Sequence, residues 1–596
     1  MSADTPPTHP HRTSRRLRII AQDPGFRKRR DGGGEIVTAL AELPAEELLP
    51  GPTGYRVKVI DYDVSTDTLY RPAQIPSSED GAATDPYAEA GDQDLLTDPR
   101  FHAQNVYAIV MRTLARFEKA LGRRVEWGCD GHQLHVAPHA FAEPNAFYSR
   151  SDRALFFGYF RGRDKRTIFT CLSHDVIAHE ATHAILDGLR SRFFEPSNKD
   201  QAAFHEGFAD IVAMLSIFSL RDVVAAMLDD ATDREAAARD APPAAGDETA
   251  HALIDVEFLE PKWLKESAIF GLADEMGKDL SGVRGRALRR SVMLDPDETP
   301  PDRPEFDQEH RRGELLVAAM LNAFLDIWLR RIDRLGTIVA GKKDRSLVVE
   351  AGSRVADHLL TMAIRAIDYC PPVDVGFADY LSALLTIDHE VVPDDDRYGY
   401  RDTLLRQFAR FGIAPAHGAG PDGTWQRCSA RLTYSRTHFD SLLRDKQEVF
   451  RFVWENRKAL EIDERGYIEI ESVRTAMRIA PDGFLLRETV AEYVQILTLT
   501  AKELREIGIE LPDGVAADKR LRVYGGGTLI FDEYGQLKYQ IANHLANRQQ
   551  DLDRQTERMQ HLWMRGMLDA PDDASARLAA LHLARAGAIG DANATH

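Results

Sequence analysis

Cysteine and long apolar runs are both scarce in this sequence of 596 residues. The four cysteines lie far apart, at Cys129, Cys171, Cys370 and Cys428. They form no CxxC pair, so the sequence excludes a disulfide scaffold and favours a reducing compartment. The longest apolar candidate, Leu315–Leu329, is shorter than the roughly 18 residues of a membrane span and contains Asn322 and Asp326. We therefore expect no membrane-spanning segment.

Basic residues are fewer than acidic residues. Lys and Arg total 75 and Asp and Glu total 94, which gives a net charge of −19. Because nucleic acids and anionic membranes attract positively charged surfaces, we expect neither as a partner. Ser14-Arg15-Arg16 is similar to the start of a twin-arginine export signal, but only Ile19-Ile20-Ala21 follows as an apolar region. We therefore predict a cytoplasmic protein.

The remaining composition is that of a folded protein with several units. Hydrophobic residues make up 43% and charged residues 28%, close to the averages of globular domains. The hydrophobic period changes along the chain between strand-like and helical, which predicts the α+β class. The expected units, in chain order, are a disordered start at 1–16, a β-rich lobe at 17–172, a helical lobe at 173–413, an α+β domain of unknown role at 425–570 and a flexible tail at 571–596.

Individual elements follow from the same periodicities. A strand is predicted at Tyr55–Ile60, and a helix is predicted from Phe101 to Leu121, where apolar residues recur at helical spacing. The elements expected in the C-terminal unit are a helix near 438–458 and strands near 467–477, 483–499, 521–531 and 536–541.

The most informative stretch is an HExxH motif that begins at His179 and ends at His183. On a helix, residues four apart share one face, so the two histidines can bind the same metal ion. Glu180 lies beside them and can act as a general base toward a water molecule. Apolar residues on both sides predict a partly buried helix, where such polar side chains need partners. The motif therefore favours a metal centre over a solvated helix face.

A catalytic zinc ion takes three protein ligands and leaves one position open. The segment Phe-His-Glu-Gly-Phe-Ala-Asp at 204–210 supplies a third ligand on a second helix, and we predict Glu206. Asp210 lies one turn later on the same face, where it can accept the remaining N–H of a ligand histidine. His205 is the rival ligand, although it points about 100° away from Glu206 around the helix.

In the order and spacing of these residues, the sequence resembles the thermolysin-like gluzincin metallopeptidases over roughly residues 100–330. That family has an Asp four residues before the first ligand His, where Asp175 stands here, and an Asp four residues after the second, where Asp187 stands. Its third-ligand Glu is also followed by an Asp after four residues. Upstream, the family has an Asn-Ala pair at an edge strand, and Asn145-Ala146 stands in that place.

The resemblance implies a two-lobed zinc endopeptidase spanning 17–413. Zn²⁺ would be the cofactor, held by His179, His183 and Glu206. Glu180 would take a proton from the attacking water and pass it to the leaving amine.

The resemblance also implies roles around the ligands. Asp210 and Asp187 would support the ligand side chains through hydrogen bonds. Asn145 and Ala146 would pair with the backbone of a protein or peptide substrate, because an edge strand carries unpaired N–H and C=O groups.

Departures from the family pattern leave an alternative open. Phe194 aligns with the tyrosine that donates to the oxyanion, and the loss of one such donor can lower the rate ~10²–10³-fold. His310, which precedes a long apolar helix, is our candidate for the family's other oxyanion donor. The alternative is a catalytically weak or latent zinc-binding protein that acts through a partner, with the domain at 425–570 as the docking site of a regulatory protein. A third interpretation is hydrolysis of a non-peptide substrate.

Two further features of the sequence receive no functional prediction. The family's calcium ligands are not evident after the third-ligand helix, so we predict no calcium site. His132, His135 and His139 lie in strand-like or loop sequence without ligand spacing, and we interpret them as structural.

Overall fold

Strands dominate the first quarter of the chain, helices the middle and a mixture the end, so the predicted α+β class is confirmed. The coordinates are a computed structural model. They describe residues 14–28, 34–76, 85–129, 131–162, 165–195, 197–238, 253–259, 264–265, 291, 293–294, 303–339, 341–394, 398–479 and 485–568. The predicted tail at 571–596 lies outside the described residues.

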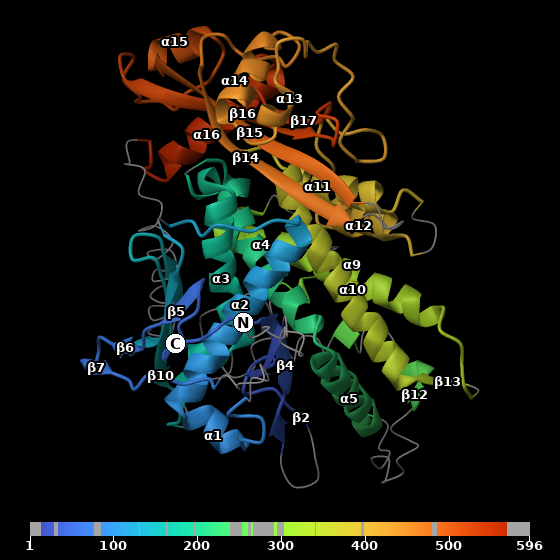
Figure 1. Cartoon of the computed structure of the whole chain (residues 1–596). Coiled ribbons are helices and arrows are strands. Elements are labelled where there is room, and N and C mark those ends of the chain that lie inside the picture. The colour runs from blue at the N-terminus through green and yellow to red at the C-terminus, as the bar shows by residue number, and fades with distance from the viewer. Residues whose placement is uncertain are drawn as a thin grey trace, which may run out of the picture.

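The first part of the chain forms a mixed sheet packed against the long helix α2 (Figure 1). Its elements are β1 (Ser14–Ile20), β2 (Arg27–Lys28), β3 (Glu35–Ile36), β4 (Thr38–Pro44), β5 (Val57–Val59), β6 (Tyr62–Asp63), β7 (Thr68–Leu69), α1 (Asp92–Thr97), α2 (Pro99–Leu121), β8 (Leu134–Phe141), β9 (Ala146–Ser149), β10 (Ala154–Arg161), β11 (Thr167–Phe169) and the 3-10 turn η1 (Thr170–Leu172). The main sheet has the order β11-β10-β8-β5, and β9 pairs with β10. The predicted helix at 101–121 is confirmed to within two residues.

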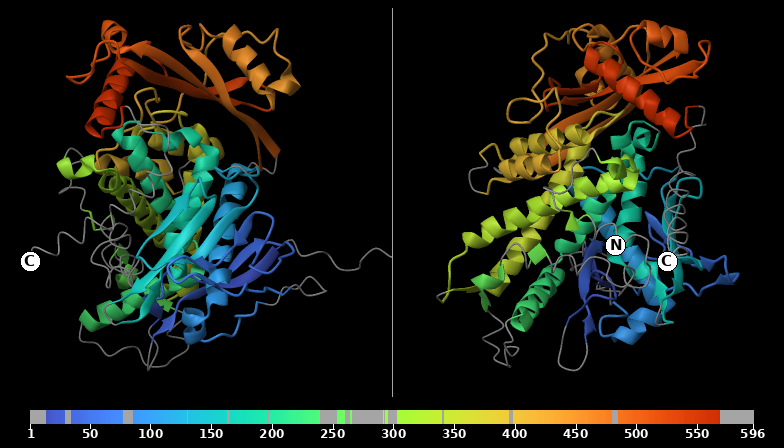
Figure 2. Two further views of the ribbon diagram at one scale, coloured as in Figure 1. Left: turned by 90° about the vertical axis from the view of Figure 1, so that its left-hand side faces the viewer. Right: turned by 180° about the vertical axis from the view of Figure 1, so that it is seen from behind.

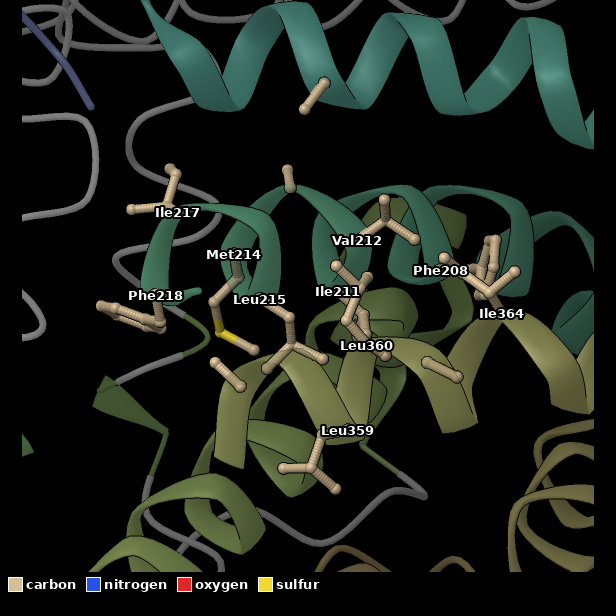
Figure 3. Close-up of a cluster of buried hydrophobic side chains, with 14 of the residues drawn as sticks. Phe208, Ile211, Val212, Met214, Leu215, Ile217, Phe218, Leu359, Leu360 and Ile364 are labelled. Atoms are coloured by element: carbon tan, nitrogen blue, oxygen red, sulfur yellow. The ribbon is translucent and has the colours of Figure 1, made fainter. Parts of the chain in front are cut away.

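Helices fill the middle of the chain. They are α3 (His174–Leu189), η2 (Ser191–Phe194), α4 (Lys199–Phe218), α5 (Arg221–Ala238), η4 (Val256–Leu259), η5 (Pro304–Asp307), α9 (Glu309–Asp333), α10 (Arg345–Ala366), η6 (Ile367–Tyr369), α11 (Phe377–Val391) and α12 (Tyr400–Arg410), with the short strands β12 (Leu253–Asp255) and β13 (Lys342–Asp344). Helix α4 is buried along almost its whole length. Its apolar residues Ile211 and Leu215 face Leu360 of α10 (Figure 3).

Helices α4 and α9 cross at a pair of glycines. A Cβ atom on Gly207 would lie 3.0 Å from the Gly313 carbonyl oxygen, and one on Gly313 would lie 2.8 Å from the Ala203 carbonyl oxygen. Any larger side chain at either position would push the two helices apart. The glycines therefore allow the close approach that brings Glu206 of α4 near His310 of α9.

The last part of the chain is a four-stranded antiparallel sheet with short helices. Its elements are α13 (Phe439–Leu442), α14 (Lys446–Glu455), β14 (Tyr467–Ile479), β15 (Leu485–Thr500), α15 (Ala501–Glu506), β16 (Arg520–Phe531), β17 (Leu537–Asn543) and α16 (Gln549–Met564). The strand order is β14-β15-β16-β17, and the four predicted strands are confirmed. The sheet lies over one end of the helical part (Figure 2).

This sheet is joined to the helices by apolar packing and by buried charges. Val490 and Ile530 belong to the same buried cluster as the helical core. Arg190, directly after α3, pairs with Glu492 of β15 at 2.9 Å and donates to the Thr528 hydroxyl of β16. Because these groups are almost fully buried, each charge depends on its partner rather than on water. The end of α3 is therefore tied to the C-terminal sheet.

A second buried charge lies at the same junction. Asp368 of η6 accepts hydrogen bonds from both Nη atoms of Arg123, at 2.6 and 2.7 Å, and lies 3.7 Å from Arg478 of β14. Burial favours the neutral carboxyl, but the nearby guanidinium groups outweigh burial and lower the pKa of Asp368 to about 2. Since the pKa is lower in the folded than in the unfolded chain, this carboxylate stabilises the fold above its unfolded pKa.

The Asp368 contribution should disappear in acid. We expect the free energy of unfolding of the wild type to exceed that of Asp368→Asn at pH 6, and the difference to shrink as the pH falls from about 5 to about 2. Urea titrations of both proteins across this range measure the difference. A difference that stayed constant with pH would contradict the assignment of the low pKa.

One predicted boundary is wrong. Residues 14–16, expected to be disordered, belong to β1, where they pair with residues 42–44 of β4; the rest of the predicted disordered start lies outside the described residues. The pairing partner is distant in sequence, so local polarity did not reveal this strand. Within the described part of the chain, no single helix has the length and apolarity to cross a membrane, although α4 with the first part of α5, bent by 79°, passes the same test.

Candidate metal centre

The two histidines of the HExxH motif and the predicted third ligand meet between α3 and α4. The Nε2 atoms of His179 and His183 each lie 3.7 Å from a different oxygen of Glu206. One ligand atom from each residue lies within 4.8 Å of the other two, and all three residues are buried. Two imidazoles and one carboxylate at this spacing can hold a metal ion.

Glu180 occupies the position next to His179 on α3. Its side chain is fully buried. A carboxylate buried beside a metal centre is positioned to exchange a proton with a water molecule bound there. Glu180 is therefore the candidate general base of this site.

Asp210 holds the first histidine in place. Its Oδ1 lies 2.7 Å from Nδ1 of His179, and Glu206 lies one helical turn earlier on the same helix. The Nδ1–H of His179 donates to this carboxylate, which directs the lone pair of Nε2 toward the cluster. Asp210 thus makes the predicted hydrogen bond to a candidate ligand histidine.

Removal of this support should weaken metal binding. We expect Asp210→Ala to lower the affinity for Zn²⁺ about 10–100-fold, because the His179 ring loses its fixed orientation. Competition with a chromophoric chelator measures the affinity. Asp222→Ala, at an exposed position of α5, is the control and should leave the affinity unchanged. An unchanged affinity in Asp210→Ala would contradict the role of this contact.

His310 lies against the same glutamate. Its Nδ1 atom is 3.1 Å from Oε2 of Glu206, and its side chain is 16% exposed, twice the exposure of Glu206. The residue is in the first turn of α9. The close packing of α4 and α9 at Gly207 and Gly313 brings it near Glu206. The structure thus brings His310 to the metal centre and places its Nδ1 edge on Glu206.

Phe194 and His205 line another side of the centre. The His205 ring stacks on His183 with centroids 4.7 Å apart, and the Phe194 ring meets His205 edge-on with centroids 4.0 Å apart. Neither ring nitrogen of His205 has a hydrogen-bond partner among the residues that the structure describes. Burial lowers its pKa to about 3, so the ring is neutral at ordinary pH. His205 is not part of the three-residue group that can hold the ion.

The predicted substrate-binding pair lies at the start of β9. This strand pairs with β10 and packs against α3. Asn145 and Ala146 are buried, and the Asn145 side-chain oxygen accepts from the Ala146 N–H at 2.9 Å. The Asn145 Nδ2 group is buried without a hydrogen-bond partner in the described part of the chain. A buried donor of this kind can bind a carbonyl group of a ligand.

The other two predicted aspartates make contacts away from the ligand atoms. Asp187 accepts from the Tyr148 hydroxyl at 2.9 Å and pairs with Arg150 at 3.0 Å. Burial raises the pKa of Asp187 to about 7 despite Arg150. Asp175 accepts from the Ser173 hydroxyl, and burial raises its pKa. Asp187 thus fastens α3 to the strand β9 instead of contacting a ligand histidine.

A second group that can hold a metal ion was not predicted. It consists of His102, His139 and Cys171, all buried, with ligand atoms within 4.8 Å of one another. His139 was interpreted as structural because the sequence shows no ligand spacing around it. The three residues come from α2, β8 and η1, and no sequence motif links them.

No family model and no curated protein matches this chain.

Proposed function

We propose that this protein is a zinc-dependent endopeptidase with the two-lobed architecture of the thermolysin-like gluzincins. The observation that carries the proposal is the convergence of His179, His183 and Glu206 from two buried helices, with Asp210 on the outer nitrogen of His179. This combination of ligands and support is typical of catalytic zinc sites. Two histidines and one carboxylate leave an open position for reaction.

The donor set fits Zn²⁺ better than calcium or magnesium. Imidazole nitrogens suit zinc, whereas calcium and magnesium prefer oxygen ligands alone. When bound, zinc would supply Lewis acidity that polarises the scissile carbonyl and lowers the pKa of water. The chain itself has to supply the proton transfers and the orientation of the substrate.

Glu180 is the residue for the proton transfers. Its buried carboxylate would accept a proton from the attacking water and then give it to the leaving amine. The same group can perform both steps because it lies beside the metal ligands on a helix that is fixed at both ends. The bond broken is the peptide C–N bond, and the new C–O bond comes from water.

The position of β9 supports a peptide substrate. The strand belongs to the N-terminal sheet and lies beside α3. In the proposed architecture the metal centre would lie at the boundary of the two lobes. An extended peptide could add to this strand and receive a hydrogen bond from the Asn145 Nδ2 group. A main-chain contact of this kind selects for peptides in general, rather than for one side chain.

The oxyanion needs a donor other than residue 194. His310 and His205 are the two imidazoles next to the ligands. His310 is the stronger candidate because its Nδ1 is already oriented by Glu206, whereas His205 packs between the rings of His183 and Phe194. A donor at either position would compensate for the phenylalanine.

The alternative function is a latent or weak zinc-binding protein controlled by a partner. Phe194 is the observation that favours it, because this residue donates no hydrogen bond to an oxyanion. The decisive experiment measures the zinc content and the cleavage of a peptide library for the wild type beside Glu180→Gln. Zinc with cleavage supports the endopeptidase, and zinc without cleavage at any pH supports the alternative. A wild type that holds no more zinc than His179→Ala/His183→Ala overturns both.

A further inference from the structure

The second histidine–cysteine group lies in the core beside the N-terminal sheet. His102 is in the first turns of α2, His139 is on β8 and Cys171 is in η1, and each is at most 1% exposed. Phe169 packs against both imidazole rings, at 4.8 and 5.1 Å between centroids. Three potential ligands are therefore gathered in an apolar environment that excludes water.

The hydrogen bonds of the two imidazoles orient them toward one point. His102 Nε2 donates to the Leu96 carbonyl oxygen at 3.1 Å, and His139 Nδ1 lies 2.9 and 3.0 Å from the two oxygens of Asp61. The remaining nitrogens, His102 Nδ1 and His139 Nε2, face each other at 2.8 Å. Histidine ligands of metal ions show this pattern, with the outer N–H on a carbonyl or carboxylate and the inner nitrogen on the metal.

The protons of the metal-free cluster can be counted from these contacts. His102 Nε2 carries a proton, because its partner is a carbonyl oxygen. One further proton lies in the hydrogen bond between His102 Nδ1 and His139 Nε2, because two bare lone pairs would repel each other at 2.8 Å. Burial raises the pKa of Cys171 well above its usual value, so this residue is a thiol.

We propose that His102 Nδ1, His139 Nε2 and Cys171 Sγ form a second metal site, which binds a thiolate-preferring divalent ion of the Zn²⁺ class. Binding forms two metal–nitrogen bonds and one metal–sulfur bond. It releases two protons, one from the thiol and one from the hydrogen bond between the two imidazoles. The net charge of the cluster stays the same, because the divalent ion replaces two protons.

The spacing of the two nitrogens is close to that of a zinc site. Zinc–nitrogen bonds of about 2.0–2.1 Å at a tetrahedral angle separate two nitrogens by about 3.3 Å, compared with 2.8 Å here. The two nitrogens would have to move about 0.5 Å apart. A sulfur and two imidazoles exclude calcium and magnesium, which take oxygen ligands.

The site would connect three elements that hold the catalytic helix. Cys171 stands eight residues before His179, in the turn that leads into α3. The other two ligands belong to the long helix and to the central sheet. An ion at this position would thus fix the start of α3 relative to the sheet.

Cobalt distinguishes this site from the HExxH centre, because only the second site contains sulfur. Full-length protein is freed of metal, loaded with Co²⁺ and examined for the near-ultraviolet thiolate-to-cobalt charge-transfer band. We expect about two cobalt ions and the band in the wild type, and about one ion with the band retained in His179→Ala/His183→Ala. Cys171→Ser should lose the band and keep about one ion. Cys428→Ser, in the C-terminal part, is the matched control and should behave as the wild type.

The outcomes separate the two sites. A wild type without the band, or with a band that Cys171→Ser does not remove, overturns the second site whatever the result at the HExxH centre. If Cys171→Ser fails to fold, His179→Ala/His183→Ala still tests the second site. This variant lacks the HExxH ligands, so a charge-transfer band in it comes from cobalt bound elsewhere through sulfur. A hydrogen-bonded cluster without metal affinity would give one ion and no band in the wild type, and this result also overturns the proposal.

Discussion

Glu180→Gln is expected to keep one zinc ion at the HExxH centre and to lose peptide cleavage by at least about 10²–10⁴-fold, the usual contribution of a general base. The amide has the size and shape of the carboxylate, so the buried helix should pack as before. The amide cannot take a proton from water. The attack of water and the protonation of the leaving amine therefore both lose the group that transfers the proton. Initial rates on a fluorogenic peptide library, together with metal analysis, measure the effect.

The control for this variant is Glu510→Gln, at an exposed position of the C-terminal part. It makes the same chemical change far from the metal ligands in sequence and should cleave like the wild type. Turnover in Glu180→Gln close to that of the wild type would contradict the proposed mechanism. Loss of zinc together with activity would show that Glu180 supports the ligands and would leave the base unassigned.

Asp374→Ala should cause the largest loss of stability. The Asp374 side chain is fully buried, accepts a hydrogen bond from Ser197 and pairs with Arg558 and Arg554 of α16. Burial opposes the charge, but the two guanidinium groups lower the pKa of this carboxyl. Removal of the carboxylate takes away the counter-charge that the two arginines share, although Arg554 keeps its pair with Asp551, so we expect a decrease of about 3–5 kcal/mol in the free energy of unfolding.

Urea unfolding followed by tryptophan fluorescence measures this decrease. Glu506→Ala is the comparison, because it breaks an exposed pair with Lys502 whose side chains are 62% and 73% accessible. Such surface pairs contribute little, so this variant should stay within about 0.5 kcal/mol of the wild type. If Asp374→Ala unfolds at the urea concentration of the wild type, the buried pairs do not hold α16 to the helical part.

Local patterns account for what could be predicted from the sequence. The apolar spacing of α2 and the alternation in the four C-terminal strands are properties of short segments, and both agree with the structure. The spacing of His179 and His183 is likewise set by one helix. Glu206 required only the next helix, because Asp210 marks which face of that helix points to the histidines.

Contacts between distant segments account for what could not be predicted. His102 and His139 are 37 residues apart and meet because α2 packs against β8. Each residue looks unremarkable in its own segment, so ligand spacing along the chain did not identify them. The same reason applies to Asp187, whose partner Tyr148 is 39 residues away on β9. A short stretch of sequence does not show which residues of another strand or helix it will contact in the fold.

The attachment of α3 at both ends has a consequence for how the protein opens. At its start the His174 N–H donates to the Gln22 carbonyl oxygen at 2.7 Å, and after its last turn Arg190 reaches Thr528, which is 338 residues away in sequence. A helix held at both ends resists fraying, so we expect its amide protons to exchange with solvent mainly when a larger part of the protein unfolds. The backbone of the HExxH histidines would then unfold together with strands from the far end of the chain.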